Sequence, residues 1–272
     1  MSTKRSDSTI DERLRKREYI IDIKRRKRVK RSEEKEVFDE VFNKSTTILI
    51  YDLMNKGIIK DFYGAIASGK ESKIFYATDI KNRELAVKIY LNLNREFRRS
   101  MSQYIEGDPR FLKVPKRSWD LIQLWAKKEF VNLQNLSNAG LRVPTPYHLE
   151  RNVLVMEFIG KEGKGALLLK ESKLSVHDYT EVYDKVLNFM IVAARSAHLV
   201  HGDLGEYNIM LYEGTPVFFD VSQAVSIEHP LAGQLFKRDF ENVKKYFENK
   251  GVNVTSLNRF IEQTGGLGFD VT

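Results

Sequence analysis

The sequence predicts an α+β fold of two lobes, a small antiparallel sheet followed by a reduced and mainly helical part. Two short apolar strands, at 74–78 and 85–90, are separated by a polar turn in the first half of the chain. Helical spacing of apolar residues dominates the second half, over 177–199, 239–250 and 256–263. With 272 residues, the chain is long enough to bury a substantial core.

The first lobe is expected over residues 37–157 and begins with a helix. Hydroxyl residues precede the apolar segment 48–56 and Gly57 follows it, which is the usual pattern of helix capping. A short strand is predicted at 58–63, and the glycine-containing loop 65–72 joins it to the next strand. These elements form the small antiparallel sheet.

The chain changes character after the sheet strands. Residues 91–116 are polar and rich in arginine, so we expect a long loop, and such loops are usually functional or mobile. A helix is predicted at 118–139, ended by Gly140, and a buried strand at 153–159. The helical second lobe is expected over 158–272.

The N-terminal segment carries most of the excess positive charge. The formal net charge is +8, and residues 1–36 hold 14 Lys and Arg against 8 Asp and Glu. A segment this polar cannot bury enough apolar surface to fold alone, so we predict a disordered arm. Its charge favours RNA phosphates, with a solubility tail as the alternative.

The amino-acid composition indicates an intracellular protein. The chain has no cysteine, which suits a reducing cytosol, and its five histidines show no metal-ligand spacing. No apolar run approaches the roughly 20 residues of a membrane span. We therefore expect a soluble, cytoplasmic protein with no membrane partner.

Residues 201–223 contain the side chains that phosphoryl transfer from ATP requires. Asp203 is followed five residues later by Asn208, and Asp220 ends an apolar run. Kinases use one carboxylate to orient the attacking hydroxyl, and an amide and a second carboxylate to hold Mg²⁺ on the phosphates. A hairpin predicted around the turn 213–216 would bring Asn208 and Asp220 together.

Lys88 supplies the basic residue of such a site. It lies on a predicted strand of the small sheet, where protein kinases carry the lysine that contacts the α- and β-phosphates. This lysine needs an acidic partner. Glu129 in the following helix is one candidate, and Glu71 is the other. In chain order, these residues predict a protein-kinase-like fold.

A P-loop motif is matched only in part. Residues 64–70 fit its glycine and lysine positions, but Glu71 stands where the Ser or Thr belongs, and a strand follows instead of a helix. Without a helix N-terminus, the loop amides cannot cradle phosphate in that manner. We interpret the loop as a cover over the phosphates, with Gly69 permitting close approach of its backbone.

Two departures distinguish the chain from ordinary protein kinases. Asp220 is followed by Val-Ser-Gln instead of Phe-Gly, and only 52 residues remain after it, too few for an activation loop and peptide-binding helices. The chain resembles the RIO family of atypical kinases, and its first, archaeal-like subfamily more than the second. The matching segments are 68–72, 104–111, 125–130, 155–160, 201–208 and 220–224, within residues 40–250.

This resemblance implies roles for individual residues. Asp203 would be the catalytic acid/base, and Asp220 the second catalytic residue, at which a phospho-Asp intermediate forms. Asn208 and Asp220 would bind Mg²⁺, and Lys88 the phosphates of ATP. The nucleotide site would also include Ser68, Gly69, Lys70, Glu129, Asn208 and the hinge backbone of Glu157 and Ile159.

The resemblance also implies an activity and a partner. We expect a Mg-ATP-dependent serine/threonine kinase and ATPase in small ribosomal subunit maturation, bound to the pre-ribosomal small subunit and its RNA through the basic arm, without DNA sequence specificity. The alternatives are an aminoglycoside-type small-molecule phosphotransferase and a nucleotide-gated binding module with negligible turnover. Ser100 and Ser102 are the candidate autophosphorylation sites, although the arginines of residues 91–116 could instead contact RNA.

Overall fold

The computed structural model describes residues 44–69, 71–91, 95–111, 113–264, 266–267 and 269–271. Residues 49–272 form one unit by their internal contacts. The basic arm predicted over 1–36 and Lys70 lie outside the described residues. Within the described ranges, no helix has the length and apolar character needed to cross a membrane.

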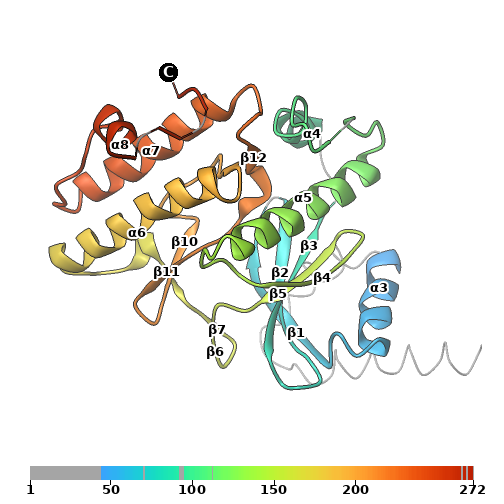
Figure 1. The fold of residues 1–272 in the computed structure, drawn as a ribbon. Helices are drawn as coiled ribbons and strands as arrows, with labels where there is room; N and C mark the ends of the chain where they lie inside the picture. The colour runs from blue at the N-terminus through green and yellow to red at the C-terminus, as the bar shows by residue number, and fades with distance from the viewer. Residues whose placement is uncertain are drawn as a thin grey trace, which may run out of the picture. The chain divides into compact units, whose positions relative to one another are not determined.

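A five-stranded antiparallel sheet forms the first part of this unit (Figure 1). Its strand order is β1-β2-β3-β5-β4, so β3 lies in the centre. The strands are β1 (Asp61–Ser68), β2 (Ser72–Thr78), β3 (Glu84–Tyr90), β4 (Pro146–Glu150) and β5 (Val153–Glu157). Every residue of β3 after Glu84 is buried, including Lys88. The central strand therefore places the side chain of Lys88 in the protein interior.

The turn predicted between β2 and β3 is confirmed, and Asp79 holds it. The Asp79 carboxylate accepts hydrogen bonds from the N–H groups of Lys81 and Arg83, both at 2.8 Å. An aspartate that bonds the backbone a few residues ahead in this way stabilises a tight turn.

The first strand differs from its prediction. The sequence predicts a strand at 58–63 and a loop at 65–72, but β1 runs as far as Ser68 and pairs with β2 through two register shifts. Such bulges let a strand bend while it stays paired. The connection to β2 is therefore shorter than predicted, and the Gly69 N–H donates to the first carbonyl of β2 at 2.9 Å.

The prediction of a long irregular loop at 91–116 is wrong for residues 95–102, whereas residues 103–111 and 113–116 form no helix or strand. The segment contains helix α4 (Arg95–Ser102), while residues 92–94 and 112 lie outside the described residues. Met101, Tyr104 and Ile105 are buried in the core. These few apolar side chains are dispersed among arginines, so the polarity of the segment as a whole conceals its apolar face.

The helix predicted at 118–139 is confirmed as α5 (Ser118–Asn138). Its buried residues recur on one face, as expected for an amphipathic helix that covers a sheet. Gly140 follows with φ of 80°, a conformation in which glycine meets no steric penalty. Helix α5 contacts β4, β5 and the 3₁₀ helix η2 (Val221–Gln223), so one rigid element touches both the sheet and the segment after Asp220.

The second part of the unit is mainly helical. Helix α6 (Val176–Arg195) begins at a capping box, in which the Ser175 hydroxyl accepts from the Asp178 N–H at 3.2 Å. It ends before the predicted residue 199, which belongs instead to β9 (Leu199–Val200), and β9 pairs with β12 (Val225–Ser226). The last helices are α7 (Ala232–Glu248), which starts before the predicted residue 239, and α8 (Leu257–Thr264).

The predicted hairpin is confirmed as β10 (Ile209–Tyr212) and β11 (Thr215–Phe218). Its turn is shorter than the predicted 213–216: Glu213 and Gly214 have φ of 50° and 72°, as a two-residue type I′ turn requires. The short elements β6 (Gly160–Lys161), β7 (Lys164–Gly165), β8 (Leu167–Leu168) and η1 (Leu169–Glu171) connect the sheet to α6.

One continuous apolar cluster contains buried residues from both predicted lobes, from Ala86 in β3 to Val271 after α8. The predicted lobe boundary, between residues 157 and 158, falls at the end of β5.

Candidate active site

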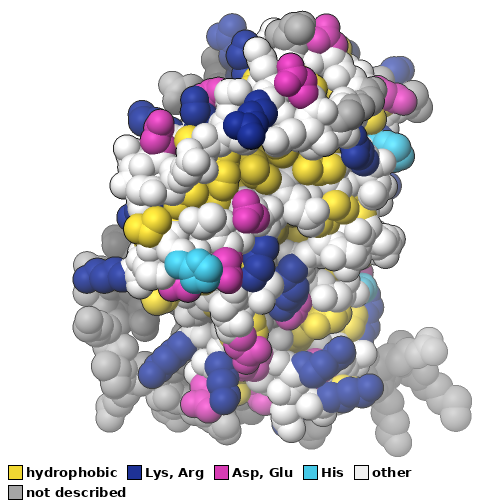
Figure 2. Space-filling model, turned by 60° about the vertical axis from the view of Figure 1, so that its left-hand side comes forward, with side chains coloured by type: hydrophobic (Ala, Val, Ile, Leu, Met, Phe, Trp, Pro, Cys, Tyr) yellow, Lys and Arg dark blue, Asp and Glu magenta, His cyan; other side chains and the backbone are white. Residues whose placement is uncertain are grey.

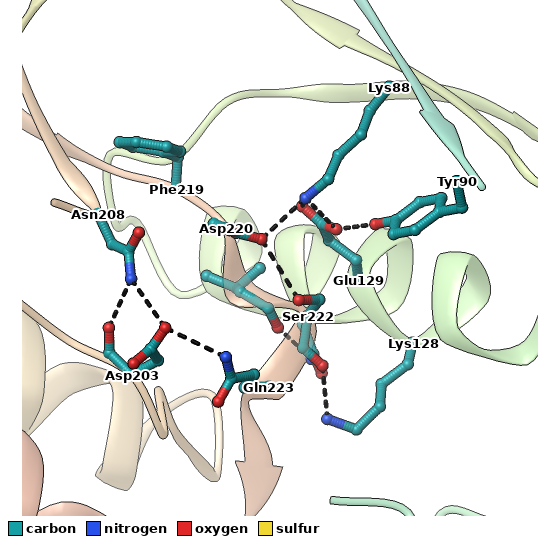
Figure 3. A network of polar contacts seen from close by, with 12 residues as sticks. Lys88, Tyr90, Lys128, Glu129, Asp203, Asn208, Phe219, Asp220, Ser222 and Gln223 are labelled. Atoms are coloured by element: carbon teal, nitrogen blue, oxygen red, sulfur yellow. Dashed lines mark hydrogen bonds and ion pairs between the residues drawn. The ribbon is translucent and has the colours of Figure 1, made fainter. Parts of the chain in front are cut away.

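The Lys88 side chain, on the central strand of the sheet, contacts acidic side chains from two later parts of the chain. Its Nζ lies 2.9 and 2.7 Å from the two carboxylate oxygens of Glu129 in α5, and 2.8 Å from Oδ1 of Asp220 (Figure 3). The Tyr90 hydroxyl also donates to Glu129. Of the two acidic partners that the sequence allows for Lys88, the structure pairs it with Glu129.

The charge on Lys88 is stabilised by these neighbours. Burial disfavours an ammonium group, but the carboxylates of Asp220 and Glu129 outweigh it and raise the pKa of Lys88 above its ordinary value. Lys88 is therefore cationic and can hold phosphate oxygens once a nucleotide is bound.

Asp220 follows strand β11 in a left-handed conformation, with φ of 54° and ψ of 53°. Its Oδ1 accepts from Lys88 Nζ and from the Ser222 hydroxyl at 3.3 Å, and its side chain is 44% exposed. Burial alone would raise the pKa of Asp220, but the attraction of Lys88 and their hydrogen bond lower it. Asp220 is thus an ionised carboxylate that stays open to the site.

Asp203 lies on the loop between β9 and β10. Its Oδ2 accepts from Nδ2 of Asn208 at 3.2 Å and from Nε2 of Gln223 at 3.1 Å (Figure 3). Asn208 Nδ2 also donates to the backbone carbonyl of Asp203 at 2.6 Å. Burial and the nearby charge of Asp220 raise the pKa of Asp203. A raised pKa brings a carboxylate closer to the range in which it can accept a proton at neutral pH.

Asp239 in α7 holds the backbone of this loop, and it is a residue that the sequence did not indicate. Its carboxylate accepts from the N–H of Gly202 at 2.7 Å and of Leu204 at 3.0 Å, on either side of Asp203. It is 1% exposed, and burial raises the pKa of Asp239 to about 7. The available signal was an acidic residue on the apolar face of a predicted helix.

The two predicted hinge residues lie at the last position of β5, Glu157, and two residues beyond it, Ile159. The Glu157 N–H donates to the carbonyl of Thr145 at 2.8 Å, and the Ile159 carbonyl accepts from the N–H of Ala166 at 2.9 Å. The Glu157 carboxylate is used elsewhere, in a two-point contact with Arg142 at 2.6 and 2.7 Å. Only backbone groups of these residues remain for a nucleotide base.

The predicted phosphate-binding residues Ser68 and Gly69 lie at the end of β1 and in the turn after it, whereas Lys70 lies outside the described residues. Glu71, in the same turn, is half-buried. Burial and the charge of Asp220 raise the pKa of Glu71 to about 7. The Glu71 carboxyl thus lies near the same charged cluster as Lys88.

The donor groups of the site fit a hydrated Mg²⁺ ion, which prefers carboxylate and carbonyl-type oxygens. Because Asn208 directs its Nδ2 to Asp203, its amide oxygen lies on the side away from that residue (Figure 3). Asp220 supplies a carboxylate. Within the described ranges, no group of three or more His, Cys, Asp and Glu side chains has the arrangement of a metal site. In kinases, the phosphates of the nucleotide are themselves ligands of the metal ion.

Comparisons with a family model and with known sequences point to the same family. A sequence model of the RIO domain matches residues 73–260. The chain is 37% identical over 265 residues to a RIO-type serine/threonine-protein kinase Rio1 from Haloferax volcanii, covering 97% of this chain and 90% of the relative. It is 32% identical to human serine/threonine-protein kinase RIO1 over 86% of this chain. This chain spans only 42% of the length of the human protein.

Solved structures show the same fold. The Rio2 kinase of Chaetomium thermophilum, in a complex with ADP, Mg²⁺ and phosphoaspartate, superimposes with a TM-score of 0.62 at 24% identity, covering 83% of this chain and 67% of that chain. A second structure of the same kinase gives a TM-score of 0.62 at 25% identity, over 81% and 67%. The predicted kinase-like α+β fold is confirmed.

Proposed function

This chain belongs to the RIO family of serine/threonine protein kinases, and we propose that it is a Mg-ATP-dependent kinase and ATPase in which Asp220 receives the γ-phosphoryl group. The observation that carries the proposal is the 2.8 Å contact between Lys88 and Asp220, next to the hydrogen-bonded pair of Asp203 and Asn208. This set combines a phosphate-binding cation, oxygen ligands for Mg²⁺ and a separate base.

Each residue would contribute one part of nucleotide binding. Lys88 would hold the α- and β-phosphates, Asn208 and Asp220 would bind Mg²⁺, and the turn after β1 would cover the phosphates. The Glu157 carbonyl and the Ile159 N–H are the hinge groups that we assign to adenine, since their other backbone groups bond within the protein.

The chemistry divides between the two aspartates. When bound, ATP would supply the phosphoryl group and Mg²⁺ would offset the negative charge of the phosphates. An oxygen of Asp220 would form the new P–O bond while the bond from the γ-phosphorus to the bridging oxygen breaks and ADP leaves. Asp203 would then accept a proton from the water that attacks the acyl phosphate, releasing phosphate and restoring Asp220. With a Ser or Thr acceptor, Asp203 would accept the hydroxyl proton instead.

The test is to label the protein with ATP that carries a labelled γ-phosphate. We expect acid-stable, hydroxylamine-sensitive label at Asp220, and Asp220→Ala should lose this label together with Mg²⁺-dependent nucleotide binding. Label confined to Ser or Thr, with Asp220→Ala unchanged in nucleotide binding, would contradict the proposal.

We also propose that the partner is the pre-ribosomal small subunit with its RNA, bound through the basic arm of residues 1–36. The arm accounts for an excess of 6 positive charges, 14 against 8, out of the total of +8. On the face of the molecule in Figure 2, Lys and Arg side chains are interspersed with Asp and Glu. A mixed surface of this kind is a weaker attractor for RNA phosphates than a basic segment.

A further inference from the structure

The backbone directly after Asp220 is held by side chains of α5. The carbonyl of Val221 accepts from Nδ2 of Asn132 at 2.8 Å, and the carbonyl of Ser222 accepts from Nζ of Lys128 at 2.9 Å. Asn132 and Lys128 are four residues apart, so they project from the same face of the helix. One helical turn therefore satisfies the carbonyls of η2.

A third carbonyl, that of Ala224, collects more donors. It accepts from Asn132 Nδ2 at 3.1 Å, from Arg110 Nη2 at 3.3 Å and from Lys128. Arg110 is itself fixed by Asp108, through bonds of 2.6 and 2.8 Å, and by Asn132 Oδ1 at 2.7 Å. Asp108 and Arg110, which lie between α4 and α5, thus add a second set of contacts to the same backbone.

Asp108 ties the far end of the same backbone. Its Oδ2 accepts from the N–H of Ser226, the last residue of β12, at 3.2 Å. The four side chains of Asp108, Arg110, Lys128 and Asn132, which we call the carbonyl clamp, therefore hold the chain from residue 221 to residue 226.

The clamp is deeply buried. Lys128 and Asn132 are 0% exposed and Asp108 is 1% exposed. Burial, with the nearby charge of Arg110, lowers the pKa of Lys128 well below its ordinary value. Burying such polar groups is unfavourable unless every one is hydrogen-bonded. Moving residues 221–224 out of place would break the bonds to their three carbonyls and leave buried donors without partners, so this segment is held in one position.

We propose that the carbonyl clamp positions Asp220 for metal binding, so that the site is preformed before nucleotide arrives. Glu129, which holds Lys88, lies directly after Lys128 on α5. The same turn of α5 therefore fixes Lys88, through Glu129, and the backbone next to Asp220, through Lys128. In ordinary protein kinases the segment after this aspartate switches between active and inactive arrangements. In this chain, hydrogen bonds hold that segment from α5 on one side and from Asp108 and Arg110 on the other. The inference rests on the proposed role of Asp220 as a Mg²⁺ ligand.

The test uses Asn132→Leu and Lys128→Met in the full-length protein, which retain much of the side-chain volume but remove the donors. Amide hydrogen exchange of residues 221–226 in the nucleotide-free protein should become faster. The Mg²⁺ concentration for half-maximal ADP binding should rise by about tenfold or more, as expected when groups that orient a metal ligand are removed. ADP binding in EDTA should not change. Lys127→Met is the matched control, because Lys127 is exposed on the same helix.

Normal exchange, or faster exchange with an unchanged Mg²⁺ requirement, would overturn the inference, since a purely structural clamp would lower only the stability. If the two buried variants do not fold, Arg110→Ala replaces them, because the Arg110 side chain is 23% exposed. Asp220→Ala separates the two proposals. If it leaves the Mg²⁺ requirement unchanged, the proposed function fails, while the exchange rates still report whether the clamp orders residues 221–226.

Discussion

Asp203 and Asp220 show how position sets the chemistry of identical side chains. Asp203 is hydrogen-bonded to amides, and burial with the charge of Asp220 raises its pKa. Asp220 contacts Lys88, which lowers its pKa although burial opposes this. The first is suited to accept a proton and the second to remain an anion.

The amide variant Asp203→Asn should therefore lose turnover by about 10²-fold or more, the usual contribution of a positioned base. Nucleotide affinity should change little, because Lys88, Asn208 and Asp220 are intact. Steady-state ATP hydrolysis and ADP titration measure the two quantities. Turnover at the wild-type rate would remove Asp203 from its assigned role.

Asp239 predicts a pH dependence of folding stability. Its folded pKa of about 7 is above the ordinary 3.8, so its contribution to stability is complete below pH 4 and is lost as the pH rises through 7. Relative to Asp239→Asn, the wild type should lose up to about 1.4 kcal/mol per pH unit within that window.

Urea unfolding of both proteins at pH 5 and pH 7.5 measures this difference. His201 also titrates near this site, since burial lowers the pKa of His201 to about 4. It is present in both proteins, so its contribution largely cancels in the comparison. Parallel stability curves would show that Asp239 does not change its pKa on folding.

At the scale of elements, α4 distinguishes the two candidate autophosphorylation sites. Ser100 is exposed, whereas Ser102 is half-buried and its hydroxyl donates to the carbonyl of Arg98 at 2.9 Å. We expect incubation with Mg-ATP to phosphorylate Ser100 more than Ser102, because the Ser102 hydroxyl must first leave its hydrogen bond. Mass spectrometry of the wild type and Ser100→Ala measures this. Equal modification of both residues would mean that α4 unwinds before phosphorylation.

At the scale of the whole molecule, the basic arm should provide much of the affinity for RNA. Neutralised phosphates release counterions, so binding should weaken steeply with salt and show little sequence preference. Deletion of residues 1–36 should flatten that dependence and leave ATP hydrolysis nearly unchanged, because the residues from Lys88 to Asp220 are retained.

A salt titration of RNA binding, with full-length and truncated proteins side by side, tests this prediction. Identical salt slopes would reduce the arm to a solubility tail and direct attention to the arginines of residues 95–117.

The amino-acid sequence by itself determined the order of the site residues, the presence of the hairpin after Asn208 and helix α5. These depend on local signals: the five-residue spacing of Asp203 and Asn208, turn-forming residues, and the apolar period of a helix. Such signals lie within a short stretch of chain, so they can be interpreted without knowing what packs against it.

Only the tertiary structure decided which acid pairs with Lys88, that Asp239 holds the loop carrying Asp203, and that the carbonyl clamp holds the segment after Asp220. These contacts join residues far apart in the chain, as from Lys128 to Ser222, and their strength comes from burial. A charged side chain in a sequence is most often solvated. Whether it is instead desolvated and paired depends on packing, which only the folded molecule specifies.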